Sequence, residues 1–429
     1  MRKLLSLVLA MAILCGVSSA LADPIRIDGT SERNITINDT GLNKDPQALI
    51  DEDGISPTTG RYLDDIEWKE GWDAGVAPTK EGTYRPIMVQ ISNAGNGVGI
   101  SSSGKLYGTA PINASYADIV YEAPQKKGGS ETRMSMIFSD VIPDYVGFVR
   151  STRLTHVYLR QEWDCAFCTS GYSTADVPDG WRRTGTKSPQ TAVPGDPGLV
   201  YVGDFPREVW TNYVWRLSGK TDANSEIFML SEIWKNTVPQ DHKAANHTFR
   251  FTDTLPEGGD DAEIIYVTFG SKDETNSRLE YEEDKGAYVR YVSIGKTGDQ
   301  PYMDTVLVNP VLKKVRTSEG EMVTKIVAED RVLQNVMTFN NVIVQSVKFN
   351  WNDSLRPDPV LVGTGNADYF MGGRHYAGVW KKDEGAARTV FYDANGNELE
   401  LQRGRTLIIL MDYNQSINNG KDKANVQYE

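Results

Sequence analysis

The chain has 429 residues, a formal net charge of −13 at pH 7 and 39% hydrophobic residues. An acidic surface of this size argues against nucleic acid and anionic lipid as partners, because both are negatively charged. The length exceeds one ordinary domain, so we expect two or three domains with real hydrophobic cores.

The first 22 residues predict a secretory leader. Arg2 and Lys3 precede an apolar run over 4–17, and Ala20–Ala22 has the small-x-small pattern of a signal-peptidase site. We expect cleavage after Ala22 and a secreted, extracytoplasmic protein of the cell envelope. The run is shorter than the roughly 20 residues that span a membrane, so no transmembrane segment is expected in the mature chain. The bulky leucine before Cys15 does not fit the usual lipobox, which makes lipid anchoring the less favoured alternative.

The first half of the mature chain predicts a mixed α/β domain over 84–253. Residues 23–83 are rich in Asp, Asn, Thr, Gly and Pro and predict a loosely ordered lead-in. The apolar patterns after it predict strands at 87–92, 117–122, 132–139 and 145–149, then a helix at 152–163 and a short apolar segment at 165–170. Apolar residues at helical spacing over 206–217 and 226–236 predict two more helices at the end of this domain.

The second half predicts a smaller, mainly antiparallel β domain over 254–413. A linker rich in Pro, Gly and Asp at 254–261 marks the boundary. Alternating patterns then predict strands at 264–269, 279–282, 288–292, 336–339, 342–349, 375–380, 389–392 and 406–411. We expect a flexible tail over 414–429, and the predicted fold class is α+β.

An arginine-rich turn at 147–153 is the strongest candidate site. Arg150 and Arg153 flank the predicted start of a helix, with Ser151 as its N-cap. A helix N-terminus presents unpaired N–H groups and partial positive charge, so two guanidinium groups beside it favour an anion. Arg133, just inside a neighbouring predicted strand, is expected to join them.

Two carboxylates are expected near these arginines. Asp118 and Glu122 alternate along one predicted strand and therefore share a face. One interpretation is a recognition site for a carboxylate or phosphate group, with Glu122 orienting an arginine. The other is a structural network of ion pairs that ties the strands to the helix.

The cysteines and histidines give weaker signals. Cys165 and Cys168 could form a local disulfide in an oxidising compartment, or could be two small core residues. His247 is a weak candidate for a catalytic base, because no Gly-x-Ser-x-Gly nucleophile elbow accompanies it. His242 and His247 stand five residues apart, which does not suit a helical zinc pair, so no metal site is expected.

Two further loops have residues that can belong to ligand sites. The glycines at 95–99 follow a strand but precede no predicted helix, so no nucleotide or other cofactor is expected. Trp181 lies in a loop beside Arg182 and Arg183 and is the best candidate for an exposed tryptophan. With these two arginines it could form an aromatic, basic edge of the anion site.

Short motifs along the chain carry a family resemblance. They are Arg85-Pro86 with Asn93, Ala117–Glu122, Gly128–Arg133, Val149–Arg153, Ser170-Gly171, Lys243–His247, Asn341–Gln345, Trp380–Lys382, Phe391–Gly396 and Gly404–Thr406. In this order they resemble the DUF3048 family of bacterial extracytoplasmic proteins, whose members are often described as YerB-like lipoproteins. The resemblance covers about 84–412 in two family domains and implies an envelope location with no defined biochemical activity.

The sequence therefore predicts a secreted envelope protein that binds an anionic, wall-derived or small-molecule ligand. The predicted ligand-binding residues are Arg133, Arg150, Ser151, Arg153, Asn93 and Trp181. One alternative is a hydrolase or transferase acting on wall material, with Glu122 or Asp118 as general acid/base. Another is a non-catalytic scaffold that docks an envelope protein partner.

Overall fold

The computed structural model describes 24–29, 32–39, 45–67, 75–93, 99–100, 106–107, 111–127, 131–173, 177, 183, 213–217, 225–238, 240–242, 244, 249–269, 277–293, 299–316, 320, 322–352, 354–412 and 425–429. The predicted leader lies outside the described residues. No helix within the described ranges combines the length and the apolar character that crossing a membrane requires.

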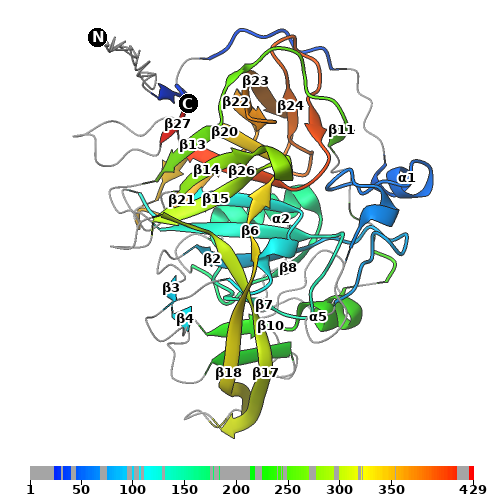
Figure 1. Ribbon diagram of the computed structural model, residues 1–429, viewed down its shortest axis with the longest axis vertical. Helices are drawn as coiled ribbons and strands as arrows, with labels where there is room; N and C mark the ends of the chain where they lie inside the picture. The colour runs from blue at the N-terminus through cyan, green and yellow to red at the C-terminus, as the bar shows by residue number, and fades with distance from the viewer. Residues whose placement is uncertain are drawn as a thin grey trace, which may run out of the picture.

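The centre of the molecule is one large, mixed β-sheet (Figure 1). Its strands run in the order β12 (Asp260–Asp261), β23 (Arg374–Lys382), β22 (Gly363–Met371), β20 (Asn341–Trp351), β26 (Thr406–Asp412), β5 (Ile119–Pro124), β6 (Thr132–Phe138), β2 (Ile87–Asn93) and β8 (Ala166–Cys168). Two short strands, β21 (Pro357–Val360) and β24 (Val390–Tyr392), branch from it. Strands from the two halves of the chain meet where β5 pairs with β26 in parallel, so both halves build one sheet.

A second sheet packs on one face of the large sheet. It contains β1 (Ile25–Arg26), β27 (Asn425–Tyr428), β13 (Ile264–Thr268), β14 (Ser277–Glu282), β15 (Ala287–Ser293), β16 (Asp299–Pro301) and β19 (Thr338–Phe339). Val120 and Leu407 of the large sheet share a core with Ile265 and Leu279 of this one. The end of the chain, predicted as part of a flexible tail, thus supplies the strand β27 between β1 and β13.

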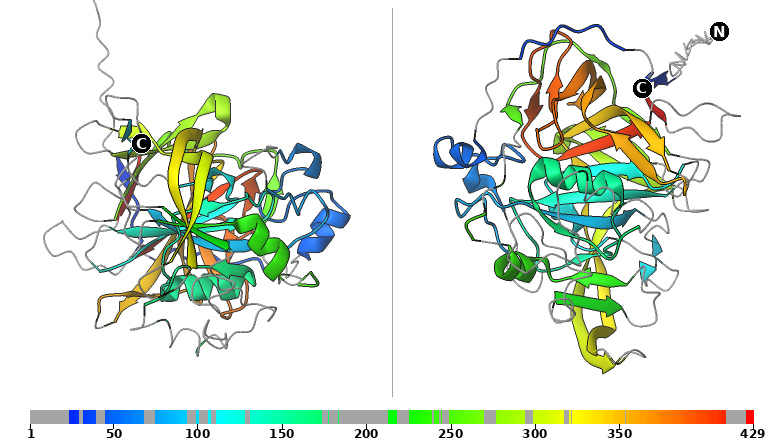
Figure 2. Two further views of the ribbon diagram at one scale, coloured as in Figure 1. Left: turned by 90° about the horizontal axis from the view of Figure 1, so that it is seen from below. Right: turned by 180° about the vertical axis from the view of Figure 1, so that it is seen from behind.

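The helix α2 (Leu154–Trp163) covers the opposite face, as the view from behind shows (Figure 2). Val157 and Trp163 of α2 pack against Tyr121 and Ile408 of the large sheet. Because both faces are covered, successive residues of β5 and β26 are all buried, and most of them are apolar.

A third sheet forms an arm that projects from the end of the molecule opposite to β1 and β27 (Figure 1). Its strands are β17 (Met303–Arg316), β18 (Met322–Val336), β9 (Val214–Leu217), β10 (Glu226–Phe228) and β7 (Val146–Gly147). A small core that includes Tyr145, Trp215 and Ile326 joins the arm to the body.

The remaining elements are short. They are α1 (Pro46–Asp51), α5 (Leu230–Thr237), the strand pairs β3 (Gly99–Ile100) with β4 (Leu106–Tyr107) and β11 (Arg250–Thr252) with β25 (Glu400–Gln402), and 3-10 turns at Leu63–Asp65, Ala114–Tyr116 and Glu283–Lys285.

The predicted α+β class is wrong, because strands make up about half of the chain and only three α-helices lie in the described ranges. No separate mixed α/β domain forms over 84–253, since its strands continue into the sheet of the second half. The helical stripe predicted over 206–217 ends instead in β9, where Trp215 and Leu217 alternate toward the arm core. A short apolar run fits both the helical period of 3.6 residues and the strand period of two. Here the pairing with β10 and β18 makes the segment a strand.

Candidate functional site

The structure brings the three predicted arginines together at the start of α2. Arg133 lies in β6 opposite Ala123, so its side chain projects toward the face that α2 covers. Arg150 and Arg153 come from the turn that leads into the helix. We call Arg133, Arg150 and Arg153 the arginine cluster.

Burial and mutual repulsion disfavour the positive charges of the cluster. Burial, followed by the charges of Arg153 and Arg150, holds the pKa of Arg133 well below its usual range. Arg356 adds to this effect, and Glu131 opposes it. Arg150 is partly exposed, and burial lowers its pKa against the opposing charges of Glu131 and Glu226.

Both buried arginines donate hydrogen bonds to backbone oxygens. The Nη1 atom of Arg133 donates to the carbonyl of Ser151, and Nη1 of Arg153 donates to the carbonyl of Thr152 at 2.9 Å. Over the described part of the chain, no carboxylate lies within ion-pair distance of Arg133. Within the described residues, Arg133 therefore has a backbone carbonyl as a hydrogen-bond partner and no acid in direct contact.

The helix begins at Leu154, so the prediction that Ser151 is its N-cap is wrong. Arg153 occupies the N-cap position, and its N–H donates to Nδ1 of His156 at 3.0 Å. His156 is fully buried, and burial together with Arg133 and Arg153 holds its pKa well below the usual range. The imidazole is thus neutral with its proton on Nε2, and that donor has no acceptor among the residues described.

Glu122 does not meet the arginine cluster, because it lies on the other face of the sheet. It pairs in the ladder with Met134, one position from Arg133, and side chains alternate between faces. Its carboxylate accepts hydrogen bonds from Asn93 at 2.7 Å and Thr132 at 2.8 Å. It also forms a fully buried ion pair with Arg290 of β15, at 3.0 Å between Oε2 and Nη2.

Asn93 and Asp118 also lie away from the cluster. Asn93, predicted to bind ligand, is buried and holds the carboxylate of Glu122. Asp118 precedes β5, five residues from Ala123, or about 17 Å along the strand. It accepts the N–H groups of Ser139 at 2.7 Å and Asp140 at 2.9 Å. Burial and the neighbouring charge of Asp140 raise the pKa of Asp118 well above its usual range.

The two cysteines are free, buried thiols on opposite sides of the large sheet. Cys168 packs toward the second sheet, whereas Cys165 packs on the side of α2. Side chains three positions apart along an extended chain point in opposite directions, which separates the two sulfur atoms. The core interpretation therefore describes the structure, and the local disulfide does not form in it.

Two predicted residues, Trp181 and His247, lie outside the described residues. Arg183, which was expected to join the anion site, is described and pairs instead with Asp358 at 2.9 Å and with the hydroxyl of Tyr158 at 2.9 Å.

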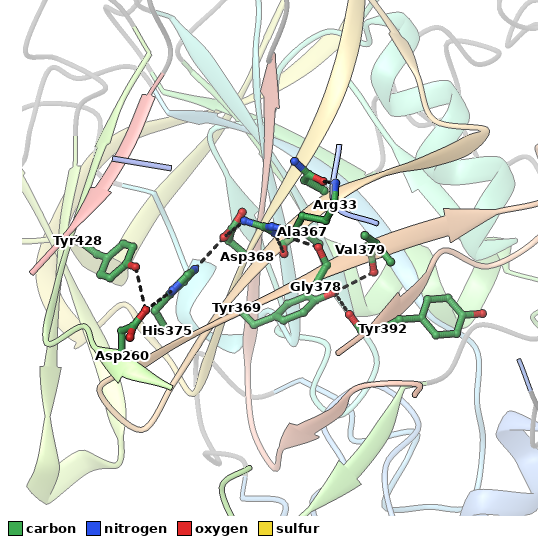
Figure 3. A network of polar contacts seen from close by, with 11 residues as sticks. Arg33, Asp260, Ala367, Asp368, Tyr369, His375, Gly378, Val379, Tyr392 and Tyr428 are labelled. Atoms are coloured by element: carbon green, nitrogen blue, oxygen red, sulfur yellow. Dashed lines mark hydrogen bonds and ion pairs between the residues drawn. The ribbon is translucent and has the colours of Figure 1, made fainter. Parts of the chain in front are cut away.

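A second polar network was missed by the sequence analysis (Figure 3). The Nε2 atom of His375 lies 2.7 Å from Oδ1 of the buried Asp368, and Nη2 of Arg33 reaches the same oxygen at 2.7 Å. On the other side of the ring, Nδ1 of His375 lies 3.8 Å from Oδ2 of Asp260. The ring of Tyr428 stacks on the imidazole with centroids 4.3 Å apart, and its hydroxyl lies 3.5 Å from Asp260.

His375 opens onto a cavity of about 810 Å³. Its walls come from β11, from the segment 254–260, from the start of β23 and from the segment 393–400 that leads into β25. Sequence spacing could not reveal this network, because Arg33 is 335 positions from Asp368 and lies in the segment predicted to be loosely ordered.

The described fold and its sites can be compared with known proteins. The crystal structure of the YerB protein from Bacillus subtilis matches with a TM-score of 0.53 and 17% identity, over 83% of this chain and 96% of that chain. At this identity the likeness shows the fold alone. No curated protein matches the chain.

Two family models match the chain itself. The N-terminal domain of DUF3048, described as a protein of unknown function, matches residues 74–188. The C-terminal domain of DUF3048, described in the same way, matches residues 265–408. The predicted boundary at 253–254 lies between the two matches. The chain belongs to the DUF3048 family.

Proposed function

We propose that this protein binds an anionic ligand, with a carboxylate or phosphate group held by Arg133, Arg150 and Arg153 at the start of α2. The observation that carries the proposal is the environment of Arg133. Its guanidinium is buried beside two other arginines, and no described carboxylate pairs with it. An isolated buried charge is unfavourable by several kcal/mol unless a counter-charge is present, and a bound anion would provide one.

Two neighbouring groups fit the same ligand. The Nε2–H group of the neutral His156 needs an acceptor, and an anionic oxygen is a strong one. The first turn of α2 adds backbone N–H groups and partial positive charge. The partly exposed Arg150 is the member of the cluster that a ligand would meet first.

We also propose that this binding takes place outside the cytoplasm. The leader predicted over residues 1–22 supports export, and the motifs shared with extracytoplasmic DUF3048 proteins support an envelope location. The ligand class would then be wall-derived or small anionic molecules.

Titration calorimetry and thermal unfolding with inorganic phosphate, pyrophosphate and soluble wall fragments test the proposal. The protein without its leader should bind at least one of these anions and become more stable. Arg150→Ala should weaken binding at least tenfold, while the unfolding temperature without ligand stays unchanged. Arg316→Ala, which removes one positive charge from the distant arm, should bind like the unaltered protein.

A second variant separates binding from a structural role. Arg133→Met removes the buried charge, so the protein without ligand should keep its stability or gain about 1 kcal/mol, and anions should no longer stabilise it. If Arg133→Met instead lowers the stability strongly and Arg150→Ala binds anions normally, the arginines are structural and the proposal is wrong.

A further inference from the structure

The cavity beside His375 has an acidic wall. Glu257, Asp260 and Glu400 line it, and all three are exposed. Within the described ranges none of them forms an ion pair with a lysine or arginine. Two further acids line the cavity. Glu398 pairs with Arg250 at 3.1 Å and with Arg388 at 2.6 Å. Asp393 accepts the backbone N–H groups of Asn395 and Asn397. The wall therefore keeps a net negative charge.

The imidazole of His375 is held so that one nitrogen faces this wall. Asp368 accepts the proton of Nε2, and Arg33 binds the same carboxylate oxygen. The ring is also fixed by stacking on Tyr428, so it presents Nδ1 toward Asp260 (Figure 3). His375 is only 7% exposed, and Nδ1 makes no hydrogen bond with any residue that the structure describes.

Two acceptors thus face each other without a donor between them. An imidazole whose single proton is on Nε2 offers a lone pair at Nδ1, and the carboxylate of Asp260 offers another. The 3.8 Å between Nδ1 and Oδ2 exceeds hydrogen-bond distance. A single nitrogen that carries two or more N–H groups could donate to both.

The cavity also offers apolar contact beyond these acceptors. Leu255, 41% exposed, and Pro256 line it from the linker. Tyr376 lines it from β23, and Leu399 lines it from the position just before β25. Its volume of about 810 Å³ falls within the range of small-molecule sites.

We infer that this cavity is a second binding site, specific for a small organic cation with a primary ammonium or guanidinium group. The charged end donates to Nδ1 of His375 and to Asp260, and the aliphatic part rests against Leu255 and Tyr376. The site is separate from the arginine cluster. His375 lies on β23 and Arg133 on β6, five strand spacings apart in the large sheet, or roughly 24 Å.

The probe that tests this inference is putrescine, with 1,4-butanediol as the uncharged molecule of the same length. Titration calorimetry should show saturable binding of putrescine and none of butanediol. Asp260→Asn should weaken the binding at least tenfold, and its exposed position lets the variant fold. Asp284→Asn, which removes a similarly exposed acid that does not line the cavity, should leave the affinity unchanged.

A spectroscopic readout locates the contact. The chain contains four histidines, so the side-chain nitrogen resonances can be assigned by substitution. Putrescine should shift the Nδ1 resonance of His375 and leave those of the other histidines in place. Arg150→Ala should keep this response, because it acts on the other site.

The inference is wrong if putrescine fails to bind at millimolar concentration, or if butanediol or potassium ions compete equally well. It is also wrong if Asp260→Asn binds putrescine with unchanged affinity.

Discussion

At the scale of single residues, the face of the large sheet from which a charged side chain projects decides which other charges it contacts. Glu122 and Arg133 stand on paired strands and only one ladder position apart, yet they project to opposite faces. Glu122 therefore pairs with Arg290 from the second sheet, and Arg133 meets Arg150 and Arg153 beside α2. The sequence could place all of these residues on strands or turns. It could not give the register, and a shift of one residue exchanges the faces.

The buried pair of Glu122 and Arg290 gives a first prediction. Glu122→Gln leaves the charge of Arg290 fully buried without its counter-ion, so the free energy of unfolding should fall by roughly 3–5 kcal/mol. The matched control is Glu232→Gln, which breaks the exposed pair with Lys235 and should lower it by less than about 1 kcal/mol. Urea unfolding measures both, and equal small losses would contradict the structural role of the pair.

The buried thiols give a pH-dependent prediction. Burial raises the pKa of Cys165 to about 12, whereas an exposed thiol titrates near pH 8.5. The unfolded chain then ionises first, so the contribution of Cys165 to stability is complete below about pH 8.5 and is lost as the pH rises toward 12.

Labelling with a thiol reagent checks this environment. At pH 8 the folded protein should react slowly at Cys165 and Cys168, and both should react at once in urea. Rapid labelling of the folded protein would show that the thiols are accessible. A loss of two mass units after mild oxidation, with labelling absent even in urea, would show that they form a disulfide.

At the scale of elements, continuous apolar runs were the most predictable. The predicted strands at 87–92, 132–139 and 406–411 agree closely with β2, β6 and β26. The arm strands β17 and β18 were missed up to residue 336, because many of their side chains are exposed and charged. Their pairing with each other, and that of β18 with β9, comes from tertiary structure that a local pattern does not contain.

The strand β27 supports both the second sheet and the cavity beside His375. It pairs with β13, buries Val426 and Tyr428, and places Tyr428 against His375. Removing residues 425–429 should lower the free energy of unfolding by about 3 kcal/mol or more, since two large side chains leave the core. Putrescine binding should be lost and anion binding kept.

Tyr428→Phe is the control for this truncation. It keeps the stacked ring and loses only a 3.5 Å contact with Asp260, so stability and putrescine binding should change little. A truncated protein that is fully stable and binds putrescine would show that β27 does not support the cavity.

At the scale of the whole molecule, a single sheet joins the two segments that match the family models. The parallel pairing of β5 with β26 runs from Ile119 opposite Thr406 to Glu122 opposite Ile409. Composition and the linker at 254–261 predicted two independent units. They could not reveal this pairing, because a parallel contact between strands nearly 290 residues apart leaves no local signal.

The same sheet holds both proposed sites. The arginine cluster lies at the start of β6 near α2, and the acidic cavity lies five strands away at β23. The molecule thus carries opposite charges at two separate places on the large sheet. Ligands of opposite charge should bind to them independently.

The most direct test of the arginine cluster is a crystal structure with tungstate, a tetrahedral oxyanion whose position anomalous scattering reveals. We predict the strongest anomalous peak beside Arg150, with oxygens within about 4 Å of the guanidinium nitrogens of Arg133 or Arg153. The peak should vanish in Arg150→Ala crystals soaked in the same way. Tungstate bound only elsewhere, with the three arginines unmoved, would contradict the account.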